Sequence, residues 1–145
     1  MKTYLINNEC IFIESKHELK NISNSIVIRM TAMRARCLRY IIENANDELI
    51  ERKALTTELW GERGDFVNDA NLTQILYLIR RDLKSLGIQE LFVTIPRRGI
   101  QVNNLIPIRP LSTDNRHNKK NKIISMLLKK MLSRFSSIMK CRYKR

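Results

Sequence analysis

The sequence predicts an α+β domain of ordinary size, in which short strands come first, helices follow and a hairpin closes the folded part. Three observations support this prediction. Residues 3–30 contain short β-branched runs separated by turn residues. Residues 31–86 carry apolar residues at helical spacing, and residues 92–102 carry two strand-like runs around a turn. A chain of 145 residues can bury such a core without disulfides or a structural metal.

The positive charge of the chain is concentrated near its C-terminal end. The formal net charge is +13. Residues 1–115 hold 16 Lys or Arg and 14 Asp or Glu, a balance of +2. Residues 116–145 hold 11 Lys or Arg and no acid, a balance of +11. Because the body is nearly neutral, any nucleic-acid binding by it must come from a local basic patch.

Cys10, Cys37 and Cys141 form an odd set without CxxC spacing and without a histidine at ligand spacing. This pattern argues against a disulfide scaffold or a metal site, and it favours a reducing compartment. We expect no cofactor. The apolar run at the N-terminus is too short and too interrupted for a signal peptide. The sequence has no run of about 18 apolar residues that would predict a membrane span. We therefore expect a cytoplasmic body.

The N-terminal strands are predicted from β-branched runs at residues 4–6, 11–13 and 26–30. Leu19 and Ile22 lie scattered between the second and third runs. We expect these segments to form an antiparallel arrangement of short strands and turns.

Two helices are predicted next. The first starts at Thr31, and its apolar members fall at helical spacing, at Ala35, Leu38, Ile41, Ile42 and Ala45. Three arginines at positions 34, 36 and 39 lie on its other faces, where they either touch phosphates or are solvated. A second, short helix runs to Trp60, a predicted core anchor, and ends at Gly61. Residues 61–66 are predicted to be an irregular polar loop.

Residues 67–86 predict the longest helix. Leu72, Leu76, Ile79 and Leu83 form its apolar stripe, Asn68 or Asp69 can cap its start, and Gly87 can end it. The opposite face is polar and cationic. It carries Ala70, Gln74, Tyr77 and Arg81, flanked by Thr73, Arg80 and Lys84. Taken alone, such a face is either a ligand-binding surface or an ordinary solvated surface.

The following hairpin favours the first alternative. Residues 92–95 and 100–102 are strand-like, and Pro96, Arg97, Arg98 and Gly99 form the turn between them. A helix can fill the major groove of DNA, and a protruding basic ribbon can contact the adjacent backbone or minor groove. A cationic helix followed directly by two arginines on a hairpin tip therefore indicates DNA binding.

A family resemblance is carried by landmarks along the chain. They are Met30-Thr31 opening a helix, Glu43-Asn44 ending it, Leu59-Trp60-Gly61 ending the next, Val67-x-Asp69-x-x-Leu72-Thr73-Gln74, Ile79-Arg80-Arg81-x-Leu83, and Thr94-Ile95-Pro96-Arg97-Arg98-Gly99. In this order they resemble the OmpR/PhoB-type winged helix-turn-helix effector domain of bacterial regulators. The Pro-Arg-Arg-Gly tip resembles the ToxR- and CadC-like transcriptional activators. The resemblance covers residues 3–105.

The resemblance implies an N-terminal antiparallel sheet, three helices and a C-terminal β-hairpin wing. It implies a recognition helix at residues 69–86 that presents Ala70, Asn71, Thr73, Gln74, Tyr77 and Arg80 to DNA. Thr94, Arg97 and Arg98 correspond to the wing positions. Residues 62–67 correspond to a loop that often touches RNA polymerase in relatives, and relatives commonly bind DNA as pairs. Several relatives carry Arg or His where this chain has Ala70, Ile75, Tyr77 and Leu78. The chain leaves no room for an upstream receiver domain, so we expect no control by phosphorylation of such a domain.

After residues 1–105, the sequence predicts a linker at residues 106–120 and a basic amphipathic helix at residues 121–145. The apolar half of this helix holds Ile123, Ile124, Leu127, Leu128, Met131, Leu132, Phe135, Ile138 and Met139. Three alternatives stay open for this tail. It lies on an anionic membrane surface, packs on a partner or on its own domain, or is a disordered polycation.

The sequence therefore predicts a sequence-specific, double-stranded DNA-binding transcriptional regulator of the nucleoid, with a possible peripheral membrane contact through its tail. The alternative is an adaptor that keeps the fold, binds a protein or a membrane surface and binds DNA weakly. We expect no enzyme, because the chain shows no phosphate-binding glycine loop, metal cluster, nucleophile elbow or convergent carboxylate pair.

Overall fold

The computed structural model describes residues 2–111. Its N-terminal part is a five-stranded antiparallel sheet with the strand order β4-β3-β2-β1-β8. The strands are β1 (Thr3–Ile6), β2 (Cys10–Ile13), β3 (Glu18–Asn21), β4 (Val27–Arg29) and β8 (Ile108–Leu111), with a short 3-10 turn, η1 (Glu14–Lys16), between β2 and β3. The predicted tail at residues 121–145 lies outside the described residues.

Strand β3 is an element that the sequence did not reveal. Leu19 lies opposite Phe12 on β2 and opposite Ile28 on β4, so it belongs to a strand. Its neighbours Glu18 and Lys20 point to the other face of the sheet, because side chains alternate along a strand. The charged outward residues hide the strand pattern.

The predicted linker boundary is wrong. We expected residues 106–120 to be a linker, but residues 108–111 form β8, which pairs with β1 at the edge of the sheet. Pro110 is compatible with this strand, since an edge strand can leave one side of its backbone unpaired. The folded body thus extends to Leu111.

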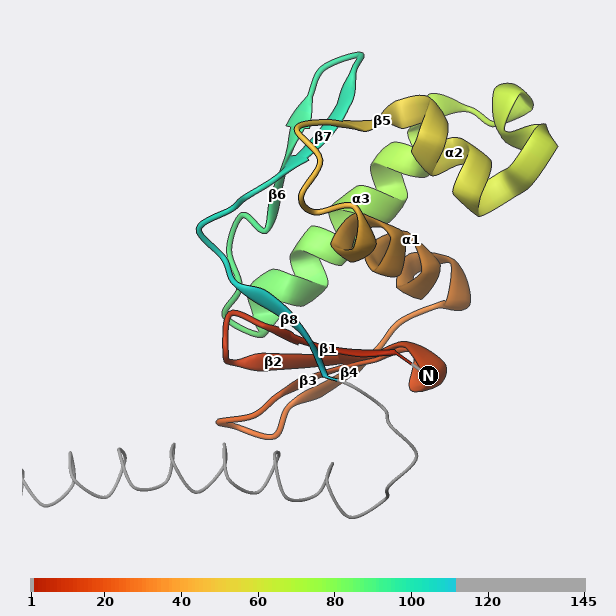
Figure 1. Ribbon diagram of the computed structural model, residues 1–145. Helices are drawn as coiled ribbons and strands as arrows, with labels where there is room; N and C mark the ends of the chain where they lie inside the picture. Colours follow the sequence, from red (N-terminus) through yellow and green to blue (C-terminus); the bar gives the residue numbers. More distant parts are fainter. Residues whose placement is uncertain (1, 112–145) are drawn as a thin grey trace, which may run out of the picture.

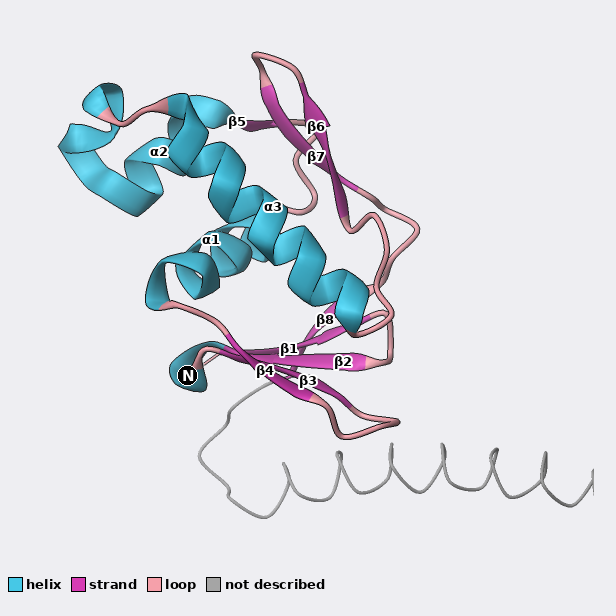
Figure 2. Ribbon diagram, turned by 180° about the vertical axis from the view of Figure 1, so that it is seen from behind, coloured by secondary structure: helices cyan, strands magenta, loops and turns pink. Residues whose placement is uncertain are grey.

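All three helices lie on the same side of this sheet (Figures 1 and 2). They are α1 (Ala32–Glu43), α2 (Arg52–Trp60) and α3 (Asp69–Ser85). Thr31 caps α1, because its hydroxyl accepts a hydrogen bond from the backbone N–H of Arg34. The loop expected at residues 61–66 is instead a 3-10 helix, η2 (Gly61–Phe66), so the two glycines there do not prevent regular structure.

A second, three-stranded antiparallel sheet has the order β5-β7-β6. It consists of β5 (Ile50–Glu51), β6 (Phe92–Ile95) and β7 (Gly99–Val102). Strands β6 and β7 form the predicted hairpin, which projects beyond the helices at the end of the molecule away from the five-stranded sheet (Figure 1). The expected fold, with a sheet, three helices and a wing, is confirmed.

One core cluster joins the three helices to the inner face of the five-stranded sheet and to the three-stranded sheet. All four stripe residues of α3, at positions 72, 76, 79 and 83, are buried there. Trp60 packs against this core while staying partly exposed, as expected of an anchor. Within residues 2–111, no helix is long and apolar enough to cross a bilayer.

Cys10 and Cys37 are free, fully buried thiols. Burial raises the pKa of each to about 12, because the thiolate is desolvated in the core. We therefore expect neither thiol to react with an alkylating reagent at pH 8 until a denaturant unfolds the body. Mass spectrometry of the peptides that contain Cys10 and Cys37 checks this. Alkylation of either peptide in the native protein would contradict the burial.

Candidate nucleic-acid interface

Helix α3 is capped at both ends, by a side chain at its start and by backbone hydrogen bonds at its end. The Asn68 side chain accepts a hydrogen bond from the Ala70 N–H at 3.2 Å, which identifies Asn68 as the N-cap. At the other end Gly87 adopts a φ of 89°. Its N–H donates to the Lys84 carbonyl, and the Ile88 N–H donates to the Leu83 carbonyl. This pair of bonds is a Schellman motif, in which glycine avoids the cost of a positive φ.

The outward face of α3 is as the sequence predicted. Ala70, Asn71, Thr73, Gln74, Tyr77, Arg81 and Lys84 are exposed, and Arg80 is half-buried. Tyr77 is 61 % exposed, so its ring is accessible on this face. The Thr73 hydroxyl donates to the Asp69 carbonyl within the helix, which leaves its oxygen lone pairs free to accept. The face combines amide, hydroxyl and guanidinium groups in one row.

The wing tip is a tight turn that displays two cations. Arg97 has a φ of 66°, and the Arg98 N–H donates back to the Ile95 carbonyl at 3.1 Å. Both arginine side chains are exposed, as is Thr94 at the start of the tip. Because neither arginine takes part in an ion pair among the described residues, both charges are free to meet an anionic partner.

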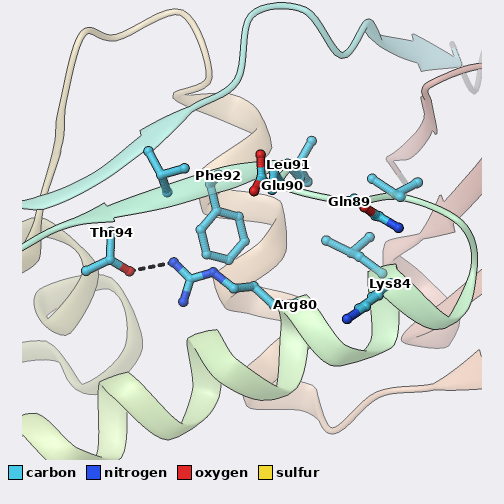
Figure 3. A pocket seen from close by; sticks show the side chains of 10 residues that line it. Arg80, Lys84, Gln89, Glu90, Leu91, Phe92 and Thr94 are labelled. Carbon is cyan, nitrogen blue, oxygen red and sulfur yellow. Dashed lines mark hydrogen bonds between the residues drawn. The ribbon is translucent and has the colours of Figure 1, made fainter.

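Arg80 joins α3 to the wing. Its Nη2 donates a hydrogen bond to Thr94 Oγ1 on β6. Its guanidinium carbon lies 4.6 Å from the centre of the Phe92 ring, a cation–π contact (Figure 3). Partial burial lowers the pKa of Arg80 below its ordinary value, although an arginine of this kind stays charged at neutral pH. Two predicted site residues from different elements thus hold each other in place.

The guanidinium of Arg80 lies at the edge of an open groove of about 480 Å³ between α3 and β6 (Figure 3). Lys84 and Glu90 also line it, together with apolar groups of β6 and the loop before it. The groove is open and of mixed charge, and it lies beside the outward face of α3. Within residues 2–111, no group of three or more His, Cys, Asp or Glu residues could hold a metal ion.

Arg52 is a second joint, which the sequence did not reveal. Its backbone N–H donates to the Arg98 carbonyl in the wing tip at 3.1 Å. Its guanidinium lies 3.0 Å from the Asp69 carboxylate and also donates to the Asp69 carbonyl at 2.9 Å. One residue at the start of α2 therefore contacts both the wing tip and the first turn of α3. No local pattern predicts it, because the partners are 17 and 46 positions away in the chain.

Two arginines of α1 have internal roles. Arg34 Nη1 lies 2.7 Å from Asp82 Oδ2, and both side chains are largely buried. Arg39 lies within 3.5 Å of Glu14, Glu43 and Glu58. Contact with phosphates was one of the two alternatives expected for these side chains. Arg34 and Arg39 do not fit it, because their charges are already paired inside the domain. Arg36 stays exposed.

The sequence has relatives among curated proteins, although no protein-family model matches it. It is 28 % identical over 109 residues to the uncharacterized protein YqeI of Escherichia coli, covering 73 % of this chain and 40 % of the relative. It is 34 % identical over 95 residues to the cholera toxin homolog transcriptional activator of Vibrio parahaemolyticus, covering 64 % of this chain and 32 % of the relative. The chain thus spans less than half the length of these relatives.

Solved structures share the fold. The DNA-binding domain of E. coli CadC matches with a TM-score of 0.60 at 17 % identity, covering 75 % of this chain and 98 % of that domain. The DNA-binding domain of the response regulator AdeR, solved in complex with an intercistronic region, matches with a TM-score of 0.55 at 13 % identity, covering 66 % of this chain and 95 % of that domain. The chain therefore has the winged helix-turn-helix fold of OmpR/PhoB-type DNA-binding domains, and its resemblance to the ToxR/CadC-like branch is confirmed.

Proposed function

We propose that the chain is a sequence-specific, double-stranded DNA-binding transcriptional regulator. The observation that carries the proposal is the joining of two exposed surfaces. The polar face of α3 and the Arg97-Arg98 tip are held together through Arg80 and Arg52. The activator named among the Vibrio relatives and the DNA complex of AdeR support the same function. We place the protein in the cytoplasm, on the nucleoid.

In this proposal α3 enters the major groove and the wing contacts the adjacent backbone or minor groove. Gln74 and Asn71 reach base edges, because amides offer a donor and an acceptor together. Thr73 and Tyr77 lie near phosphates or thymine methyl groups. The four arginines at positions 80, 81, 97 and 98 contact phosphates or a narrow minor groove, since guanidinium groups suit both.

Gln74→Ala tests the base-reading role. We expect the change to cost about 1–3 kcal/mol of binding free energy on the preferred operator and to relax base choice at one position. The operator is selected from a random DNA pool with the intact chain, and affinities are measured by fluorescence anisotropy. The matched control is Asn104→Ala, an exposed amide in the segment between β7 and β8. An equal loss on operator and random DNA would contradict base reading by Gln74.

Arg97→Ala combined with Arg98→Ala tests the wing. We expect weaker binding to every DNA sequence, and a slope of log K against log salt that is shallower by about 1–2, because each lost phosphate contact removes about 0.9 from it. Lys16→Ala combined with Lys20→Ala is the charge-matched control on the N-terminal sheet. A salt slope equal to that of the control would exclude the wing arginines from the DNA contacts.

Other partners follow from surfaces beside the interface. Residues 62–67, most of which lie in η2, correspond to the loop that often touches RNA polymerase in relatives, and Phe66 there is 90 % exposed and accessible to a partner. Pairing of two copies on tandem half-sites is part of the proposal. Binding of the tail to a membrane surface or a protein partner stays a prediction from the sequence.

The less cationic outward face of α3 supports a second candidate function. Ala70, Tyr77 and Leu78 stand where relatives carry cations, which is compatible with an adaptor that keeps the fold but binds DNA weakly. Residues 1–115 alone distinguish the two functions. If residues 1–115 still bind DNA sequence-selectively, the regulator is supported. If all selectivity is lost when the tail is removed, the adaptor is supported.

A further inference from the structure

The five-stranded sheet carries a second apolar cluster on the face opposite the helices. Leu5 and Ile11 lie directly opposite each other on β1 and β2, and Ile22 packs with them. Ile13 and Leu111 extend the cluster. The side chains before and after Leu5, those of Tyr4 and Ile6, belong to the main core instead, as the alternation along a strand requires. We call the residues 5, 11, 13, 22 and 111 the outer cluster.

Nothing in residues 2–111 forms a second layer over the outer cluster. The three helices and the wing lie on the other side of the sheet (Figures 1 and 2). An antiparallel sheet that faces water on one side normally alternates apolar and polar residues. Here the outward positions of the central strands β1 and β2 are mostly apolar, with Leu5, Ile11 and Ile13 among them. Leu5, Ile11 and Ile22 are buried, with only 3–5 % of each exposed, so a further element would contact the cluster mainly through the half-buried Ile13 and Leu111.

We propose that residues 121–145 of the same chain dock on the outer cluster through their apolar half. The described part of the chain ends on this sheet, since β8 is its edge strand and Leu111 belongs to the cluster. The nine residues at positions 112–120 can span about 30 Å. Five strands are about 19 Å from first to last. The connection therefore allows the segment to reach any part of the outer cluster.

The dimensions and the residue types of the two surfaces agree. A helix from Ile123 to Met139 is about 24 Å long, close to the width of the sheet. Its apolar half supplies branched and sulfur-containing side chains to a cluster of leucine and isoleucine. Arg109 on β8 and Lys20 on β3 flank the cluster in register with Leu5 and Ile11. Because these flanks are basic like the tail, apolar contact and not charge attraction holds the segment.

Docking would also separate two basic regions. The five-stranded sheet and the wing tip lie at opposite ends of the body (Figure 1). A docked segment therefore keeps its cations away from the DNA proposed to lie against α3. With the segment docked, the DNA affinity comes from the local patch of α3 and the wing. The total charge of +13 does not measure this affinity, because most of it belongs to the tail.

Hydrogen exchange of the full chain, followed by mass spectrometry, tests the docking. In the native protein we expect amides of residues 123–139 to exchange roughly tenfold or more slowly than free peptide. Leu127→Asp combined with Met131→Asp should abolish that protection. Ser125→Asp combined with Ser133→Asp, on the polar half of the segment, is the matched control and should retain it. Leu111→Asp on the sheet should release the segment as the tail variant does.

Protection of α3 shows in each variant that the body is still folded, and Ile13→Asp replaces Leu111→Asp if that variant unfolds. Four results would overturn the proposal. They are unprotected tail amides in the native chain, tail protection that survives both sheet variants, protection that disappears on dilution because a second copy provides it, and protection that arises only with anionic phosphatidylserine vesicles.

Discussion

Replacing Asp82 with alanine is expected to lower the free energy of unfolding by about 3–5 kcal/mol, the cost of breaking a buried ion pair from one side. Asp82 interrupts the apolar side of α3, and its side chain is only 5 % exposed. The side chain of its partner Arg34 on α1 is 15 % exposed, and Arg34 Nη1 lies 2.7 Å from Asp82 Oδ2. Without Asp82, the Arg34 charge stays largely buried and loses its counter-charge. Urea denaturation of the full chain measures the loss.

An exposed ion pair of the same domain provides the control. Asp69→Ala removes the pair with Arg52, but the Asp69 side chain is 83 % exposed, so the expected cost is about 1 kcal/mol or less. The double variant Arg34→Met with Asp82→Leu should recover most of the stability, because no buried charge remains. A loss for Asp82→Ala no larger than for Asp69→Ala would show that the buried pair contributes no more to stability than the exposed one.

The sequence predicted the elements whose pattern is local. The stripe of α3 is visible at Leu72, Leu76, Ile79 and Leu83, because each turn of a helix repeats the burial of the one before. The wing was predictable from the turn residues between two strand-like runs. Strand β8 was not, since Pro107 and Pro110 indicate a break and its partner strand β1 lies about one hundred residues away along the chain.

The candidate site shows the same division. The exposed face of α3 and the two tip arginines follow from periodicity and turn chemistry. The contacts that connect them do not. Phe92 under Arg80 and the carbonyl of Arg98 bound by Arg52 depend on how three elements pack together. The sequence likewise offered Arg34 as a surface cation, because only the folded chain shows the carboxylate that it meets.

Gly99→Ala is expected to cost at least about 3 kcal/mol of stability, at the upper end of the range for overpacking. A Cβ at this position would lie 2.0 Å from the Ile50 carbonyl oxygen and 2.9 Å from the Ile50 carbonyl carbon. Both are backbone atoms of β5, which pairs with β7 at this residue, so no side-chain rotation relieves the clash. Strands β5 and β7 must separate. Thermal and urea unfolding measure the loss.

Gly61→Ala is the matched control. Gly61 also has a positive φ, of 62°, with a ψ of −139°, but nothing lies within 4 Å of the added Cβ, so only a backbone strain of about 1–3 kcal/mol remains. Separation of β5 from β7 also moves the Arg52 N–H away from the wing tip. Under conditions where both variants are folded, Gly99→Ala should therefore weaken DNA binding and Gly61→Ala should not. Equal affinities would mean that the wing tip contributes to binding without being held by β5, and the rigid connection between the tip and α3 would then depend on Arg80 alone.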